Sequence, residues 1–110
     1  GYEGTLWAGA VLADGSLLVG GQRGTLLHGP ADGSDWRRVP LQSKSSVTAI
    51  VAGGRQVLVA GLDGLLVRSR NGGHSFQQQD AEGASLTAVL LADGDRPVLF
   101  SRRGVVPLKD

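Results

Sequence analysis

The stretch LLVGGQRG (residues 17–24) decides the fold, because the chain returns to the same pattern 40 residues later. VLVAGLDG occupies residues 57–64 and VLFSRRG ends at residue 104, so Gly24, Gly64 and Gly104 are 40 residues apart. One apolar run precedes each of these glycines and another follows it. A period of roughly 40 to 45 residues, with several short strands in each unit, is typical of the blades of a β-propeller.

Short apolar runs bounded by Gly, Asp or Asn predict strands and hairpin turns along the chain, and no segment has a sustained helical period. The first repeat (4–43) is expected to hold strands over 6–12, 16–20, 25–29 and 36–41. The second repeat (44–83) is expected to hold strands over 47–51, 56–60, 65–69 and 75–79. The third (84–110) is expected to hold strands over 86–91, 97–101 and 105–108 and to lack its outer strand. The continuous apolar inner strands (48–51 and 87–91) are expected to be covered on both faces.

The sequence therefore predicts an all-β fold: one domain (1–110) that forms a partial β-propeller of about two and three quarter four-stranded blades. Closing a propeller takes at least four blades. The chain has 110 residues and no Met, and we expect either a C-terminal fragment of a longer propeller or a protomer that completes a ring with copies of itself.

The composition narrows the function. A net charge of +1 gives no general attraction to nucleic acid or membranes, and no apolar run is long enough for a membrane span. With no Cys, the chain has no disulfide, no thiolate nucleophile and no Cys-based zinc site. His28 and His74 share no motif with metal-ligand spacing, and the segment 32–35 lacks most of the ligands of a calcium loop. We therefore expect no metal and no cofactor.

The segment SRNGGHSF (69–76) contains the strongest local motif. It resembles the Asp-box of the bacterial neuraminidase repeat, with Asn, Ser and Phe in place of Asp, Thr and Trp. The residues assigned to this structural motif are Ser69, Asn71, Gly73, Ser75 and Phe76. A short Asn side chain can hold such a turn by accepting a hydrogen bond from the backbone just ahead of it. The segment 29–36 is a degenerate copy that keeps Gly33 and Trp36 in register.

Glycine-rich second and third strands directly ahead of Asp-box positions resemble the photosystem II stability and assembly factor family, and the resemblance covers essentially the whole chain. It implies a propeller that acts as a non-enzymatic binding or assembly scaffold for a protein partner. It also implies export to the periplasm.

A sialidase-like glycoside-processing enzyme is the alternative, with its catalytic residues in blades that this chain lacks. The only glutamates are Glu3 and Glu82, and Tyr2 is the only tyrosine. Asp14 and Asp93 sit at equivalent turns two repeats apart and are interpreted as turn residues. We therefore assign no catalytic residue within this chain.

Arginine is the one residue type that suggests a binding surface, with nine Arg against two Lys. Arg23 and Arg103 fall in the same predicted turn of the first and third repeats, Asp63 falls there in the second, and Arg102 is adjacent. Arginine is suited to bidentate contacts with carboxylate or phosphate groups. We predict that Arg23, Asp63, Arg102 and Arg103 contribute to a partner-binding rim, and that self-association covers blade faces left open.

Overall fold

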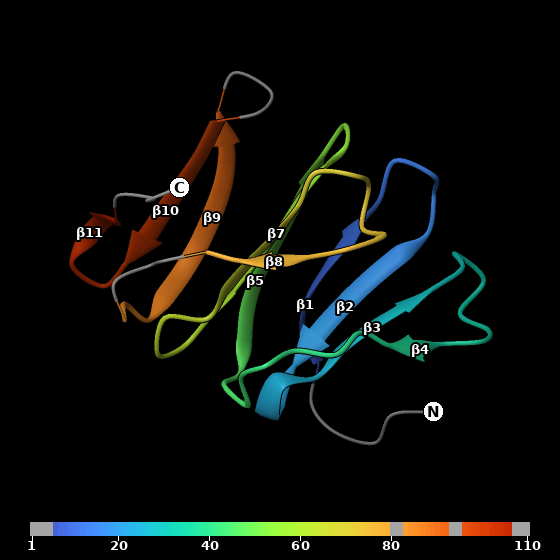
Figure 1. Cartoon of the computed structure of the whole chain (residues 1–110), viewed down its shortest axis with the longest axis horizontal. Coiled ribbons are helices and arrows are strands. Elements are labelled where there is room, and N and C mark those ends of the chain that lie inside the picture. Colours follow the sequence, from blue (N-terminus) through green and yellow to red (C-terminus); the bar gives the residue numbers. More distant parts are fainter. Residues whose placement is uncertain (1–5, 80–82, 93–95, 107–110) are drawn as a thin grey trace.

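The computed structural model describes residues 6–79, 83–92 and 96–106 and is all-β, with three antiparallel sheets side by side (Figure 1). The first sheet contains β1 (Leu6–Val11), β2 (Leu17–Gly21), β3 (Leu26–Gly29) and β4 (Arg37–Arg38). The second sheet contains β5 (Val47–Gly53), β6 (Gln56–Gly61), β7 (Leu66–Ser69) and β8 (Gln77–Gln78). The third sheet contains β9 (Leu86–Ala92), β10 (Arg96–Ser101) and β11 (Gly104–Val106). A single 3-10 turn, η1 (Gln22–Gly24), joins β2 to β3.

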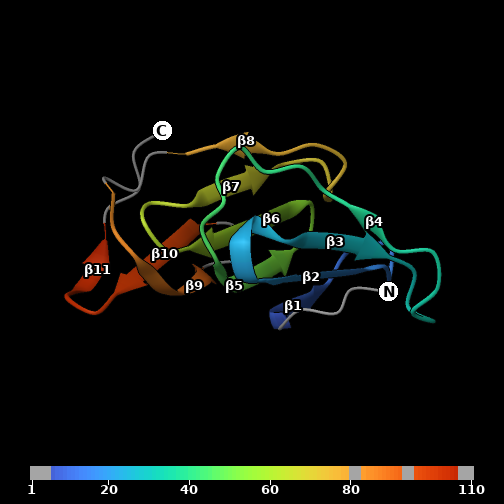
Figure 2. The same cartoon turned by 90° about the horizontal axis from the view of Figure 1, so that it is seen from below.

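Each sheet is a meander in which strands pair in the order of the chain. The inner strand β5 lies between β1 and β9, and Figure 2 shows these three strands along one side of the molecule, with β4 and β8 on the opposite side. A connector from the outer strand of one sheet therefore leads back to the inner strand of the next. The three sheets fall inside the three repeats predicted from the sequence.

The expected strands are present, but the outer ones are shorter than predicted. β4 and β8 cover two residues each, where the sequence suggested strands over 36–41 and 75–79. The paired residues are exposed Arg and Gln, and β4 and β8 pair on one side only, with β3 and β7. Val39, Leu41 and Phe76 next to them pack against the core without extending the strands. The turn at 93–94 and the end of the predicted strand 105–108 lie outside the described residues.

Two hydrophobic cores hold the sheets together, one on each face of the second sheet. Alternate residues along β6 point in opposite directions: Val57 and Val59 join the core against the first sheet, and Leu58 and Ala60 join the core against the third. All four side chains are at most 1% exposed. The prediction of inner strands covered on both faces is wrong for 87–91, because Leu90 of β9 is 54% exposed.

All three sheets share a β-bulge near the start of the inner strand. The pairing skips one residue after Leu6, Val47 and Leu86, so Trp7, Thr48 and Thr87 are structurally equivalent. The hydroxyl of Thr48 donates to the backbone oxygen of Leu86 in the neighbouring sheet at 2.6 Å, and this bond joins the second sheet to the third.

Candidate functional site

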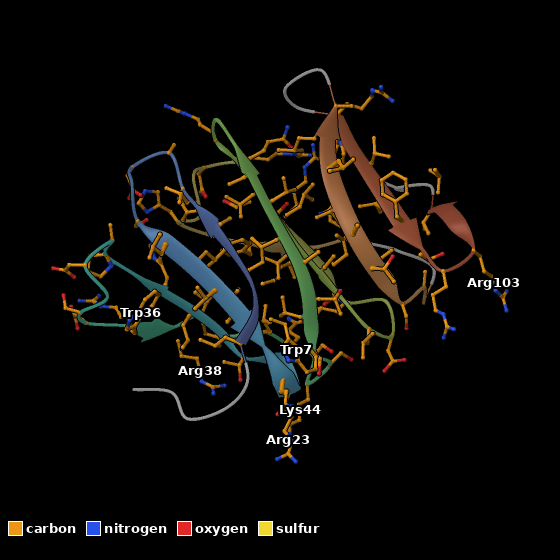
Figure 3. All side chains as sticks on the ribbon, turned by 180° about the vertical axis from the view of Figure 1, so that it is seen from behind. Trp7, Arg23, Trp36, Arg38, Lys44 and Arg103 are labelled. Atoms are coloured by element: carbon orange, nitrogen blue, oxygen red, sulfur yellow. The ribbon has the colours of Figure 1, made fainter. Side chains whose placement is uncertain are left out.

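The turns that carry the predicted binding residues lie along one edge of the molecule, formed by η1, the β6–β7 turn and the β10–β11 turn (Figure 1). We call this edge the rim and define it by Arg23, Asp63, Arg102 and Arg103. All four residues are exposed. Figure 3 shows Arg23 and Arg103 projecting away from the sheets into solvent.

The first two rim turns have the same backbone geometry. Gly21 donates to the carbonyl of Thr25 at 3.0 Å, and Gly61 donates to the carbonyl of Leu65 at 2.9 Å. Arg23 and Asp63 have left-handed conformations with φ of 56° and 54°. For a non-glycine residue this conformation costs about 1–2 kcal/mol. Local strain of this kind is concentrated at functional sites.

Each of these two residues is followed by a glycine, because the backbone of a connector lies too close to the turn to leave room for a Cβ. Gly24 and Gly64 also have positive φ, 71° and 82°. A Cβ at Gly64 would lie 3.0 Å from Cα of Gly83, and a Cβ at Gly24 would collide with the backbone oxygen of Ser43. The rim turns are therefore seated directly on the connectors that lead to the next sheet.

The third rim turn is different. β10 and β11 pair Phe100 with Val105 and Ser101 with Gly104, which leaves a two-residue turn at Arg102 and Arg103. The step of 40 residues therefore places Arg103 at the equivalent end of the sheet, but in a tighter turn than that of Arg23. The backbone N–H of Arg103 donates to Oγ of Ser101 at 3.1 Å.

Arg102 and Arg103 line an open pocket of about 410 Å³ together with Ser85 and Ser101, and residues 83–84 complete the lining. The backbone N–H of Asp63 donates to Oγ of Ser85, one of the residues that line this pocket, at 3.0 Å. Two guanidinium groups beside hydroxyl groups are suited to a carboxylate or another oxyanion. Two of the four predicted rim residues thus line one pocket, and the backbone of a third, Asp63, is hydrogen-bonded to its wall.

Arg23 lies two sheets away and has other neighbours. Lys44 belongs to the connector against which η1 packs, and its Cα lies 3.1 Å from where a Cβ at Gly24 would be. Trp7, which occupies the bulge of β1, is 48% exposed at the same end of the first sheet (Figure 3). Neither Trp7 nor Lys44 was predicted from the sequence as part of the rim. The similar patterns at 46–49 (SVTA) and 85–88 (SLTA) mark equivalent positions in the second and third repeats, but they do not by themselves indicate a bulge.

The segment 69–76 forms a hydrogen-bonded turn at the opposite end of the second sheet. Oγ of Ser69 accepts from the backbone N–H of Gly73 at 2.8 Å, and Oδ1 of Asn71 accepts from that of Ser75 at 3.0 Å. Gly73 has a φ of 96°. Phe76 packs against the core between the first and second sheets. These contacts give the segment a structural role.

His28 and His74, which share no sequence motif, line one pocket of about 340 Å³ between the first and second sheets, with Arg37, Arg38 and Phe76 among its other residues.

Within residues 6–79, 83–92 and 96–106, no three His, Asp or Glu side chains are grouped so that they could hold a metal ion. In the same part of the chain, no helix has the length and apolar character of a membrane span.

Asp14, Ser16 and His28 are in contact but are not arranged for nucleophilic catalysis. Oγ and the backbone N–H of Ser16 both donate to Oδ1 of Asp14, and Oγ also contacts Nε2 of His28 at 2.8 Å. In a catalytic triad the acid orients the histidine, whereas here it holds the serine. The hydrogen bonds from the Ser16 hydroxyl and backbone lower the pKa of Asp14. These contacts define a turn, as the sequence suggested for Asp14.

Comparisons with known proteins identify no relative: no family model, no curated protein and no solved structure matches the chain.

Proposed function

We propose that the three sheets are consecutive blades of a β-propeller and that the chain acts as a non-enzymatic binding scaffold. Three sheets that follow one another along the chain, with equivalent inner-strand bulges and outer-to-inner connectors, support the propeller. The resemblance of 69–76 to an Asp-box, and of the glycine-rich strands to the photosystem II assembly factor family, supports an assembly role in an exported protein.

The binding surface is the rim, and its partner is a protein that presents acidic side chains. The observation that carries this proposal is the pocket shared by Arg102 and Arg103, to which Asp63 is tethered through Ser85. Arginine presents a planar fork of N–H donors that matches a carboxylate. Aspartate or glutamate side chains on a loop of the partner fit this pocket.

A labelled acidic peptide tests the proposal. The chain should bind a fluorescein-labelled Glu-rich peptide, measured by anisotropy at low salt, and should not bind the matching Gln peptide. Removing Arg102 and Arg103 together should weaken binding about tenfold, because each exposed ion pair contributes up to about 1 kcal/mol. The matched control is the double variant Arg37→Ala/Arg38→Ala, which removes two exposed adjacent arginines from β4 and should bind normally. Equal loss in both double variants would show that net charge, and not the rim, attracts the peptide.

A further inference from the structure

The second sheet is covered on both faces, whereas the first and third are covered on one. Within β6 every residue from 57 to 61 is buried. In β2, Leu18 and Gly20 are buried while Leu17 and Val19 are half-buried, and in β10 only Leu99 is buried. Within the described part of the chain, the outward faces of the first and third sheets are therefore open, although their residues are apolar.

The second sheet contacts the third through one of its faces. The residues on the open face of the third sheet are equivalent to the residues of that face. Strand register makes these residues equivalent, since Leu58 pairs with Val51 and Val98 pairs with Leu90. The open face consists of Ala88, Leu90, Val98, Phe100 and Val105, equivalent to Ala49, Val51, Leu58, Ala60 and Leu66 of the second sheet. Leu90 and Val105 are 54% and 68% exposed, whereas Leu58 and Leu66 are fully buried.

The open face of the first sheet repeats the other side of the same interface. It consists of Gly9, Val11, Leu17, Val19 and Leu27, equivalent to Ile50, Ala52, Val57, Val59 and Val67 of the second sheet. The latter set packs against the first sheet. Val11 is 65% exposed. The two open faces are therefore the two complementary halves of a packing that the chain makes twice internally.

A polar contact marks the same complementarity. Thr48 bonds the backbone oxygen of Leu86 in the next sheet, and Thr87 occupies the equivalent bulge of the third sheet, with its hydroxyl 3.3 Å from the carbonyl of Phe100. The residue equivalent to Leu86 at the other end of the stack is Leu6. A copy of this chain placed beyond the third sheet would present the carbonyl of Leu6 to Thr87.

We propose that a second copy of this chain stacks head to tail on the first, with the open face of the third sheet against the open face of the partner's first sheet. The inference rests on the propeller architecture proposed above. Head-to-tail contacts form closed rings where the rotation permits it. Two copies supply six sheets, within the usual range of about four to eight blades, whereas three copies supply nine. The expected assembly is a closed dimer with two identical interfaces.

Light scattering coupled to size exclusion tests this assembly through one variant on each face. The chain should have twice the monomer mass of 11.3 kDa. Leu90→Glu on the third sheet and Val11→Glu on the first should each reduce the mass to that of the monomer, because either change spoils both interfaces of the ring. An equimolar mixture should recover part of the dimer mass, since the intact first sheet of one variant meets the intact third sheet of the other at one of the two interfaces.

The controls separate this inference from its alternatives. Gln78→Glu adds the same charge on exposed β8 and should leave the dimer intact, and Val105→Glu should reproduce Leu90→Glu. Far-UV circular dichroism checks that each variant is folded. A monomeric wild-type chain, a dimer that survives Leu90→Glu, or a mass that keeps growing with concentration would overturn the closed head-to-tail dimer. A monomer that still binds the acidic peptide through its rim would refute this inference alone, and a dimer indifferent to that peptide would refute only the proposed function.

Discussion

Replacing the three glycines of the 40-residue repeat by alanine, one at a time, separates two reasons for their presence. Gly24, Gly64 and Gly104 all have positive φ, of 71°, 82° and 108°, so each substitution incurs the left-handed penalty of about 1–2 kcal/mol. Their surroundings differ. A Cβ at Gly64 would lie 3.0 Å from Cα of Gly83, and at Gly24 it would collide with the carbonyl of Ser43, whereas at Gly104 nothing lies within 4 Å.

The steric contribution can be added to the conformational one. Both obstructing groups are backbone atoms of connectors that run between sheets, so the connector backbone must shift to make room for a Cβ. Forcing extra volume into such a contact costs typically about 1–3 kcal/mol. We therefore expect losses of about 2–5 kcal/mol for Gly24→Ala and Gly64→Ala but about 1–2 kcal/mol for Gly104→Ala.

Urea unfolding followed by tryptophan fluorescence and circular dichroism measures these losses as shifts of the midpoint at constant slope. Gly104→Ala is the matched control, since it has the same chemical change and the same sign of φ. If Gly104→Ala destabilised the chain as much as Gly64→Ala, the close approach of turn and connector would not be the reason for the glycine. The structural distinction between the third rim turn and the other two would then be refuted.

Three further predictions concern the core, the turn at 69–76 and the acid limb of stability. Leu58→Ala should cost about 2–5 kcal/mol in urea unfolding because its side chain is fully buried, whereas Leu90→Ala at an exposed site should cost less than about 1 kcal/mol in monomeric protein. Asn71→Ala removes the acceptor for a backbone amide and should cost about 1–2 kcal/mol, while Asn71→Asp keeps that acceptor and should be nearly neutral. The pKa of Asp14 lies below its ordinary value of 3.8 because Ser16 donates to it, so its contribution to stability is present above that value and is lost as the pH falls through the lower, folded-state pKa. Ser16→Ala should therefore move the carboxyl titration of Asp14, followed by NMR, upward toward 3.8, and an unchanged midpoint would contradict the assignment.

The strand pattern was predictable because period-two alternation and turn glycines are local signals. Gly24, Gly64 and Gly104 indicate where the turns lie, and the apolar runs on either side of each glycine indicate the strands. The two-residue length of β4 and β8 was not predictable in this way, since apolar neighbours such as Val39 and Phe76 pack against the core without joining the strand ladder.

The sequence predicted where Arg23 and Arg103 lie in their sheets, but not the backbone geometry of the turns that carry them. Spacing alone put Arg23 and Arg103 at the same end of their sheets, and the structure agrees. Spacing could not show that the β10–β11 turn is tighter, because a change in register leaves the residue count between repeats almost unaltered. The contribution of Ser85 comes from a connector whose path depends on how two sheets pack, which no local pattern encodes.

The bulge at the start of each inner strand was missed for a similar reason. Thr48 and Thr87 are ordinary strand residues by propensity, and only the pairing register shows that they are skipped. Trp7 occupies the same position in the first sheet, but it differs from Thr48 and Thr87 in size and chemistry. The sequence therefore gives no sign that the three residues are structurally equivalent.

The serial arrangement of the sheets has a mechanical consequence. The inner strand β5 contacts both β1 and β9, and each sheet is built from one continuous segment of the chain. A chain pulled from its ends should therefore lose its sheets one at a time, with the first and second repeats each releasing roughly 40 residues, or about 13–14 nm of extended length, and the shorter third repeat releasing about 9 nm. An optical-tweezers trace should show two long steps of similar length and one shorter step, with the doubly covered middle sheet giving way last.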